Sequence, residues 1–116
     1  RKAAPAAVLL ADISTYDEAI TAEKCGVDLD GTTLSGYTAA SADSPVPNLN
    51  LVRRLASSLS IPVLAEGNIS SPGLAVAALD SGAHSVVVGG AITRPAQICT
   101  QFVNAIHAHV PQSLEN

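Results

Sequence analysis

Residues 61–70 read IPVLAEGNIS, and residues 85–94 read SVVVGGAITR. In each stretch a short apolar run leads into glycine and a polar side chain. A continuously apolar run is typical of a strand buried on both faces, as in parallel sheets covered by helices. The glycine and polar residues then stand at the carboxyl end of the strand, where parallel α/β folds bind their ligands. These two stretches therefore predict parallel strands with a site along one edge of the sheet.

Two earlier apolar runs, at Ala7–Ala11 and Val27–Thr33, predict two more strands, so that the four strands begin at residues 7, 27, 61 and 85. Each gap between them is long enough for a helix, and strand–helix–strand crossovers imply parallel strands. An eight-unit (β/α)8 TIM barrel has about 250 residues, so four βα units fit half of one. An open sheet of the flavodoxin type, with four or five strands, fits the same arithmetic. The expected fold class is α/β, with residues 1–116 as one unit.

The expected helices have recognisable ends and apolar faces. Thr15 with Glu18 is typical of a capping box, Gly26 of a helix end, and Ser71-Pro72 of a helix start. The last helix is expected to begin near Thr93–Pro95. Apolar residues at helical spacing form the expected inner faces, namely Ala19, Ile20, Ala22 and Cys25; Leu49, Val52, Leu55, Ala56 and Leu59; Leu74, Ala75, Ala78 and Leu79; and Ile98, Phe102, Ala105 and Ile106.

The composition argues against several classes of partner. Hydrophobic residues make up 47% of the chain and charged residues 14%, with a net charge of −4. Charged residues average about 25%, so part of this surface is expected to face more protein. A general nucleic-acid binder needs a basic patch, which this net charge excludes. The longest apolar stretch, residues 3–11, is far shorter than the roughly 20 residues of a membrane helix, so no membrane partner is expected.

The two cysteines and three histidines are not expected to carry chemistry. Cys25 and Cys99 lack the spacing of a zinc site or a disulfide framework, so no metal is expected and a reduced, cytoplasmic location is the default. Both are expected to be small core residues on helix faces. His84 precedes a strand, and His107 and His109 lie near the end of the last helix, so all three are expected to be structural.

Residues that can do chemistry follow every expected strand: Asp12, then Thr32 and Thr33, then Glu66, then Gly89 and Gly90. Glu66 directly follows an apolar strand, which is typical of a group that transfers protons. Its alternative role is to cap loop amides or pair with a basic side chain. Asp12 stands two residues before a helix cap, so it fits either a ligand contact or a structural role in that turn.

Gly67, Gly89 and Gly90 follow the third and fourth strands. If these are the last two strands of a barrel, the glycines occupy the usual phosphate site, where backbone N–H groups can approach an anion. Asn68 and Arg94 stand beside these turns, and the arginine could add a charge-assisted contact. The alternative is that the glycines are tight-turn residues and that Arg94 is a solvated surface side chain.

Four motifs come in order along the chain: ADIST at residues 11–15, GTTLSGYT at 31–38, AEGN at 65–68 and VGGAITRP at 88–95. Together they closely resemble the second half of the N-acetylmannosamine-6-phosphate 2-epimerase family, barrel enzymes of sialic acid and amino-sugar catabolism. The resemblance covers nearly the whole chain, and the second and fourth motifs are specific to the family. It implies that residues 1–116 are the C-terminal half of a TIM barrel, with strands five to eight.

The resemblance implies an isomerase that interconverts N-acetylmannosamine 6-phosphate and N-acetylglucosamine 6-phosphate without a cofactor. The proton at C2 of the open-chain sugar is removed and returned on the other face. Glu66 matches the family's catalytic glutamate, Asp12 an aspartate that contacts the sugar, and Arg94 the arginine after the phosphate turns. The other expected site residues are Thr32 and Thr33 for the sugar, and Gly67, Asn68, Gly89 and Gly90 for the phosphate.

The family's catalytic lysine, on the third barrel strand, has no counterpart here. The chain alone is therefore expected to be inactive, and either to form a homo-oligomer or to need an N-terminal half. One alternative is a non-catalytic half-barrel that binds phosphosugars. Another is a different phosphate-binding barrel enzyme, such as a synthase of the tryptophan or thiamine routes, against which the GTTLSGYT motif argues.

Asp30 departs from the apolar pattern of its strand. A parallel strand covered on both faces leaves no water for a carboxylate at that position. Burial of an unpaired carboxylate costs several kcal/mol unless the group is paired or protonated. Asp30 therefore argues against an intact second strand.

Overall fold

The computed structural model describes residues 3–109, with a four-stranded parallel sheet at its centre. The strands lie side by side in chain order, β1-β2-β3-β4. They are β1 (Leu10–Asp12), β2 (Leu29–Gly31), β3 (Val63–Ala65) and β4 (Ser85–Val86). The predicted parallel order is confirmed, although the paired segments are shorter than the apolar runs that indicated them.

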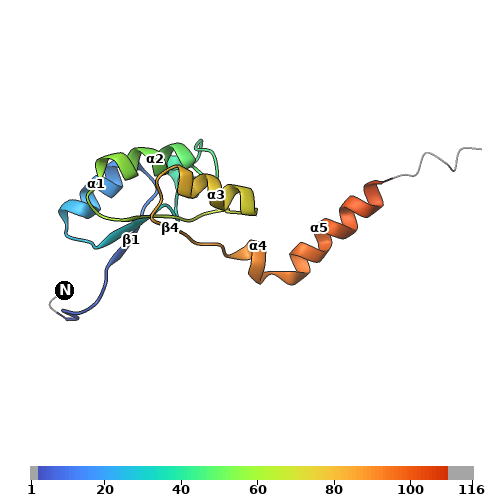
Figure 1. Cartoon of the computed structure of the whole chain (residues 1–116), viewed down its shortest axis with the longest axis horizontal. Coiled ribbons are helices and arrows are strands. Elements are labelled where there is room, and N and C mark those ends of the chain that lie inside the picture. Colours follow the sequence, from blue (N-terminus) through green and yellow to red (C-terminus); the bar gives the residue numbers. More distant parts are fainter. Residues whose placement is uncertain (1–2, 110–116) are drawn as a thin grey trace, which may run out of the picture.

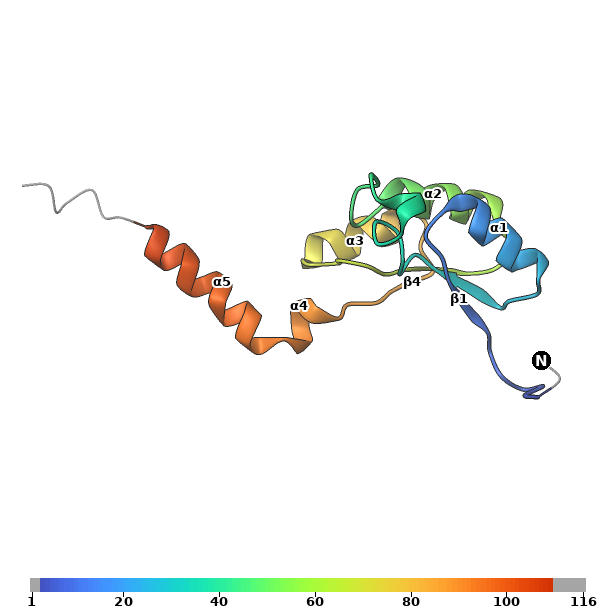
Figure 2. The same cartoon turned by 180° about the vertical axis from the view of Figure 1, so that it is seen from behind.

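Three helices lie on one face of the sheet, and two follow the last strand away from it (Figure 1). Those on the sheet are α1 (Tyr16–Lys24), α2 (Leu49–Ser58) and α3 (Pro72–Asp80), and a 3₁₀ turn, η1 (Ala39–Ser41), precedes α2. After β4 come the single-turn α4 (Gly90–Thr93) and the longer α5 (Pro95–Ala108). Seen from behind, α4 and α5 again project from the sheet (Figure 2). The described chain is accordingly elongated (Figures 1 and 2).

The predicted helix ends are confirmed. Thr15 accepts a hydrogen bond from the Glu18 backbone N–H, and the Glu18 carboxylate accepts from the backbone N–H groups of Ser14 and Thr15, which completes the capping box. The bonds from Ser14 lower the pKa of Glu18. Ser71 caps α3 directly before Pro72. Gly26 follows α1 with φ +84°, a conformation that glycine adopts at little cost.

The core lies between the sheet and its three helices, in two adjoining clusters of buried apolar side chains. One cluster consists of Ile13, Ala19, Leu51, Leu55 and Val63, and the other of Val52, Ala65, Ile69, Ala78 and Ala83. Val63 and Ala65 contribute from alternate positions of β3, as strand geometry requires. The helix-facing side of the sheet is therefore packed, as the sequence predicts.

The opposite face of the sheet is bare, which corrects the expectation of strands buried on both sides. Leu64 lies on this face, and the strand register sets it beside Gly31 and Ser85. Leu10 and Val87 share the face and are 45% and 37% exposed. Their exposure has a simple cause: no element within residues 3–109 covers this side of the sheet.

The last helix also differs from the prediction. Phe102 and Ile106 were expected to face inward but are 67% and 68% exposed, and Ala105 is exposed as well. Helices of α/β folds pack over the groove between two strands, and no described strand pairs with the outer edge of β4. Cys99 lies on this projecting helix, and Cys25 is the C-cap of α1. Both are exposed, so their assignment to the core was wrong.

Asp30 is fully buried on the helix-facing side of β2, between Ala11 and Val63 in the strand register. Neither of its carboxylate oxygens has a hydrogen-bond partner among the described residues. Burial raises its pKa to about 6, and the negative charge of Glu23 acts in the same direction. The strand forms despite this cost, and it pairs on both sides.

Candidate active site at the carboxyl ends of the strands

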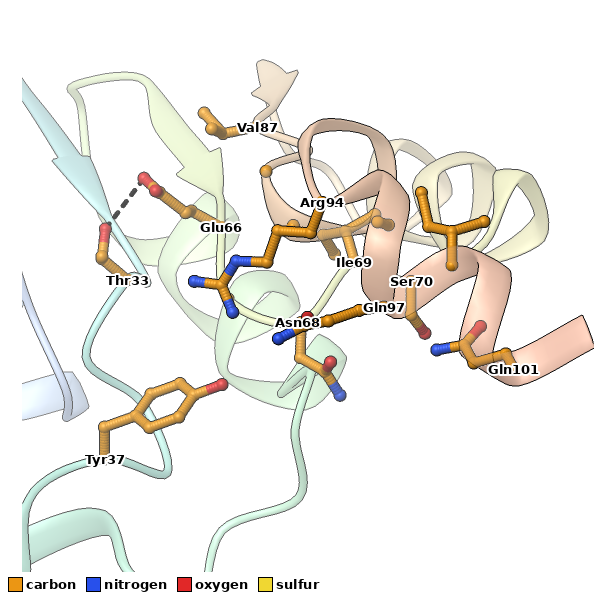
Figure 3. Close-up of a pocket in the computed structure, with 15 residues that line it drawn as sticks. Thr33, Tyr37, Glu66, Asn68, Ile69, Ser70, Val87, Arg94, Gln97 and Gln101 are labelled. Carbon is orange, nitrogen blue, oxygen red and sulfur yellow. Dashed lines mark hydrogen bonds between the residues drawn. The ribbon is translucent and has the colours of Figure 1, made fainter. Parts of the chain in front are cut away.

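Three polar side chains meet just beyond the ends of β1, β2 and β3. The Thr33 hydroxyl lies 2.9 Å from Asp12 Oδ1 and 3.0 Å from Glu66 Oε2, and Figure 3 shows the second of these bonds. Asp12 is paired with Gly31, two residues before Thr33, and Glu66 stands two residues after Leu64. Because side chains alternate along a strand, all three fall on the bare face of the sheet.

Thr32 lies on the other side of the strand and is only 3% exposed. Its hydroxyl donates to the Glu66 backbone carbonyl at 2.9 Å and accepts from the Glu66 backbone N–H at 3.1 Å. These two bonds hold the backbone of Glu66 against the end of β2. The structure thus places Thr32 behind the site, as a clamp on Glu66, while Thr33 faces into it.

A cavity of about 700 Å³ opens beside these residues (Figure 3). It is lined by seven of the nine residues expected to form the site: Thr33, Glu66, Gly67, Asn68, Gly89, Gly90 and Arg94. Asp12 and Thr32 do not line it, although both are bonded to residues that do. The Arg94 side chain points into the cavity toward the side that holds Glu66 and Tyr37 (Figure 3).

The cavity also contains residues that sequence reasoning missed. Tyr37 lines one side, and Ser70, Gln97 and Gln101 line another. Tyr37 belongs to the GTTLSGYT motif, and its place in that motif could have indicated it as a residue of the site. Gln97 and Gln101 lie one turn apart on α5, and the apolar spacing of that helix gives no indication of its polar side chains.

The turn after β3 depends on two consecutive left-handed residues. Gly67 has φ +100° and Asn68 has φ +54°, a region where asparagine is the most tolerated residue after glycine. The Asn68 amide donates to the Val46 carbonyl at 3.4 Å, which ties the turn to the loop before α2. The turn brings the backbone of Gly67 and Asn68 to the cavity wall directly after Glu66.

The turn after β4 leaves backbone open to the cavity. A methyl group at Gly89 would meet no described atom within 4 Å, whereas one at Gly90 would meet the Arg94 side chain at 3.3 Å. An open glycine beside a guanidinium is suited to an anion, because backbone N–H groups and a fixed positive charge converge.

Within residues 3–109, no group of three or more His, Cys, Asp or Glu side chains is placed to hold a metal ion. In the same range no helix has the length and apolarity to cross a membrane.

Comparison with known proteins places these features in one family. Residues 2–108 match the family model described as "Putative N-acetylmannosamine-6-phosphate epimerase". A curated protein of that description from Caldanaerobacter subterraneus subsp. tengcongensis is 52% identical over 102 residues, which are 88% of this chain and 43% of the relative. The chain therefore spans somewhat less than half the length of this curated relative.

Solved structures agree with this placement. The N-acetylmannosamine-6-phosphate 2-epimerase from Clostridium perfringens superposes with a TM-score of 0.77 and 50% identity, over 83% of this chain and 42% of that one. Thiamine phosphate pyrophosphorylase from Pyrococcus furiosus gives a TM-score of 0.65 and 30% identity, over 78% of this chain and 43% of that one. These neighbours are TIM-barrel proteins, so the four βα units are half of a barrel and the open-sheet alternative is excluded. The chain belongs to the N-acetylmannosamine-6-phosphate epimerase family.

Proposed function

We propose that this chain supplies the carboxylate and phosphate side of an isomerase that interconverts N-acetylmannosamine 6-phosphate and N-acetylglucosamine 6-phosphate. The observation that carries the proposal is one cavity with Glu66 on one wall and Arg94 beside the open Gly89-Gly90 turn on another. A carboxylate can take and return a proton. A guanidinium beside exposed backbone can hold a phosphate. The family membership supports the same reaction.

The chemistry follows from the open-chain form of the sugar. The C2 proton lies next to the C1 carbonyl, so its removal by Glu66 leaves a negative charge that is delocalised onto the carbonyl oxygen. Return of a proton to the opposite face of C2 inverts that centre, and nothing is oxidised or reduced. Inversion needs a second proton-carrying group on the far side of C2. The family resemblance assigns that role to a lysine on the third barrel strand.

Phosphate binding places the sugar for this step. Arg94, Gly89 and Gly90 form one wall of the cavity, while Gly67 and Asn68 form the turn beside Glu66. With the phosphate at C6 held by the arginine and the glycine turns, the other end of the open chain extends toward Glu66. We infer that Asp12, which lies outside the cavity but is bonded to Thr33, contacts sugar hydroxyls, in keeping with the family resemblance. No redox or metal cofactor enters this scheme.

The competing proposal is a half-barrel that binds phosphosugars without turning them over. Its support is the content of the cavity, which within residues 3–109 is lined by one carboxylate, Glu66, and by no lysine. A thiamine-type synthase has weaker support, because the identity to the Pyrococcus furiosus enzyme is 30% against 50% for the Clostridium perfringens epimerase. The free, exposed thiols of Cys25 and Cys99 fit the proposal of a reducing, cytoplasmic compartment.

The test is an epimerase assay on two proteins: this chain alone, and the chain fused behind the half of the Caldanaerobacter relative that it does not match, here called the complete-barrel fusion. We expect turnover by the fusion and none by the chain alone. Gly89→Asp in the fusion should raise KM for the phosphosugar about tenfold or more, because it adds a like charge to the anion site. The readouts are the C2 epimer ratio and KM.

Gly73→Asp is the matched control, since it makes the same change in the first turn of α3, away from the cavity lining, where a Cβ would meet only the Ser71 side chain at 3.9 Å. It should leave KM within about twofold of the parent value. A fusion that binds the phosphosugar but shows no turnover would support the non-catalytic proposal instead. An unchanged KM for Gly89→Asp would contradict the phosphate site.

We also propose that the chain on its own associates with further copies. The free edges of β1 and β4 can each pair with another strand, and the bare sheet face presents Leu10 and Val87. Apolar side chains on α5, among them Phe102, add to the exposed area. Light scattering of the purified chain should show dimers or larger species, and a monodisperse monomer at micromolar concentration would contradict the proposal.

A further inference from the structure

The Thr33 hydroxyl lies between two carboxylates on neighbouring strands. It is 2.9 Å from Asp12 Oδ1 and 3.0 Å from Glu66 Oε2, and both distances are those of hydrogen bonds. A hydroxyl has one hydrogen to donate, and an ionised carboxylate can only accept. When both carboxylates are ionised, Thr33 can therefore donate to one of them at a time.

The backbone leaves room for this three-way contact. Gly31, which precedes both threonines at the end of β2, has no side chain at the point where the three groups meet. A Cβ there would stand 3.2 Å from Thr33 Oγ1 and 3.6 Å from Asp12 Oδ1. A methyl group at position 31 would crowd the Thr33 hydroxyl, which would have to shift by a few tenths of an ångström, and would be in ordinary contact with Asp12. The close approach of Thr33 to Asp12 is thus favoured by a glycine that pairs with Asp12 and lies two residues before Thr33.

The two carboxylates are placed differently with respect to the cavity. Glu66 lines it, while Asp12 lies outside it. In the proposed reaction Glu66 takes up and returns a proton, whereas Asp12 takes no part in the proton transfer. A hydrogen bond to an ionised acceptor is roughly twice as strong as one to a neutral acceptor. Asp12 therefore becomes the stronger acceptor of the Thr33 hydrogen when Glu66 becomes neutral, whereas both carboxylates can accept it when Glu66 is ionised.

We propose that Thr33 is a positioning residue whose single hydrogen turns between Glu66 and Asp12 during the catalytic cycle; this inference rests on the proposed epimerase function. Before proton removal, the hydroxyl donates to Glu66 Oε2, which fixes the carboxylate and leaves Oε1 to face C2 of the sugar. When Oε1 takes the C2 proton, Glu66 becomes neutral and the hydroxyl rotates to donate to Asp12. It rotates back when the proton is returned. No proton leaves Thr33 in either direction.

Asp12 thereby gains a second role beside contact with the sugar. It gives the Thr33 hydrogen an ionised acceptor while Glu66 is neutral, so the hydroxyl keeps a strong bond in both states of the site. Thr32 holds the Glu66 backbone through its own two bonds, and it leaves the side-chain oxygens of Glu66 to Thr33. Thr32 thus controls the backbone position of Glu66, and Thr33, on the opposite face, controls the orientation of its carboxylate.

The kinetic test uses Thr33→Val in the complete-barrel fusion, since valine has nearly the shape of threonine but no hydroxyl. We expect kcat to fall about ten- to a hundred-fold, the loss typical of a hydrogen bond to a charged group. KM should stay within about threefold, because the phosphate contacts are untouched. Thr33→Ser, which restores the hydroxyl, should recover most of kcat. Thr21→Val makes the same chemical change on the exposed face of α1 and should leave both constants unchanged.

A second measurement needs no turnover and uses the chain as it is. The ¹³C resonances of Asp12 Cγ and Glu66 Cδ should both move in Thr33→Val and stay near their parent positions in Thr33→Ser. If the parent fusion turns over and Thr33→Val keeps full kcat, the inference is wrong and the proposed function stands. If the parent fusion shows no turnover, both fail. If only one resonance moves, Thr33 is bonded to a single carboxylate and the exchange is ruled out.

Discussion

Glu66→Gln in the complete-barrel fusion is expected to lower kcat by about two or more orders of magnitude, with KM and the fold little changed. Glutamine has the shape of glutamate and can still accept the Thr33 hydrogen bond, but its amide cannot take a proton from C2. The backbone bonds to Thr32 do not involve the side chain and should survive the substitution. The measurements are kcat, KM and the rate at which deuterium from solvent enters C2.

Asp80→Asn is the matched control for this change, because it turns another carboxylate into an amide at the exposed end of α3. It should leave kcat unchanged. Near-normal turnover by Glu66→Gln would show that the base lies elsewhere. If the variant loses turnover but still exchanges deuterium into C2, another group removes the proton. The role of Glu66 would then be limited to returning a proton to the second face of C2.

Asp30→Val is expected to make the free energy of unfolding less sensitive to pH, with the greatest gain over the parent chain near neutral pH. Burial in the folded chain raises the pKa of Asp30 to about 6, from the ordinary 3.8 of an aspartate. Between these values the folded state binds more protons than the unfolded state, so stability falls as pH rises through the window and stays low above it. The difference between these two pKa values corresponds to a loss of about 3 kcal/mol in the free energy of unfolding at pH 7.

Urea unfolding of the parent chain and of Asp30→Val at pH 4 and pH 7 tests this prediction. The lowered pKa values of Glu18 and Glu23 act with the opposite sign, because those groups stabilise the fold as pH rises. Since both proteins contain these glutamates, the comparison between them isolates Asp30. Asp80→Asn should follow the parent profile. Equal pH dependence in the parent and Asp30→Val would contradict the prediction and indicate that the carboxylate reaches water.

Much of this architecture could be predicted from the sequence because it depends on local chemistry. Apolar runs that alternate with capped helices indicate the strand–helix–strand order. A helical crossover between two neighbouring strands makes those strands parallel. Thr15, Glu18 and Ser71 predict helix starts because their partners lie within one turn. The strand-end residues could be identified as a candidate site because parallel strands bring their carboxyl ends to one edge.

The placement of individual side chains was decided by tertiary structure. Thr32 and Thr33 are chemically alike and adjacent, yet one is buried as a clamp on Glu66 and the other bridges two carboxylates. That division depends on which face of β2 packs on the helices, which the strand pairing determines. Strand pairing also explains the exposed side chains of α5. Phe102 would be buried against a strand paired with the outer edge of β4, and the described chain has no such strand.

The sequence by itself therefore determined the order of elements, the helix ends, the family and the edge of the sheet where the site lies. Each of these follows from residues close together in the chain or from the geometry common to all parallel sheets. Only the tertiary structure decided that Asp12 and Glu66 share one hydroxyl. It also decided that, within residues 3–109, Asp30 is buried without a hydrogen-bond partner and one face of the sheet is uncovered. Those facts depend on contacts between residues far apart in sequence, and strand register and packing decide such contacts.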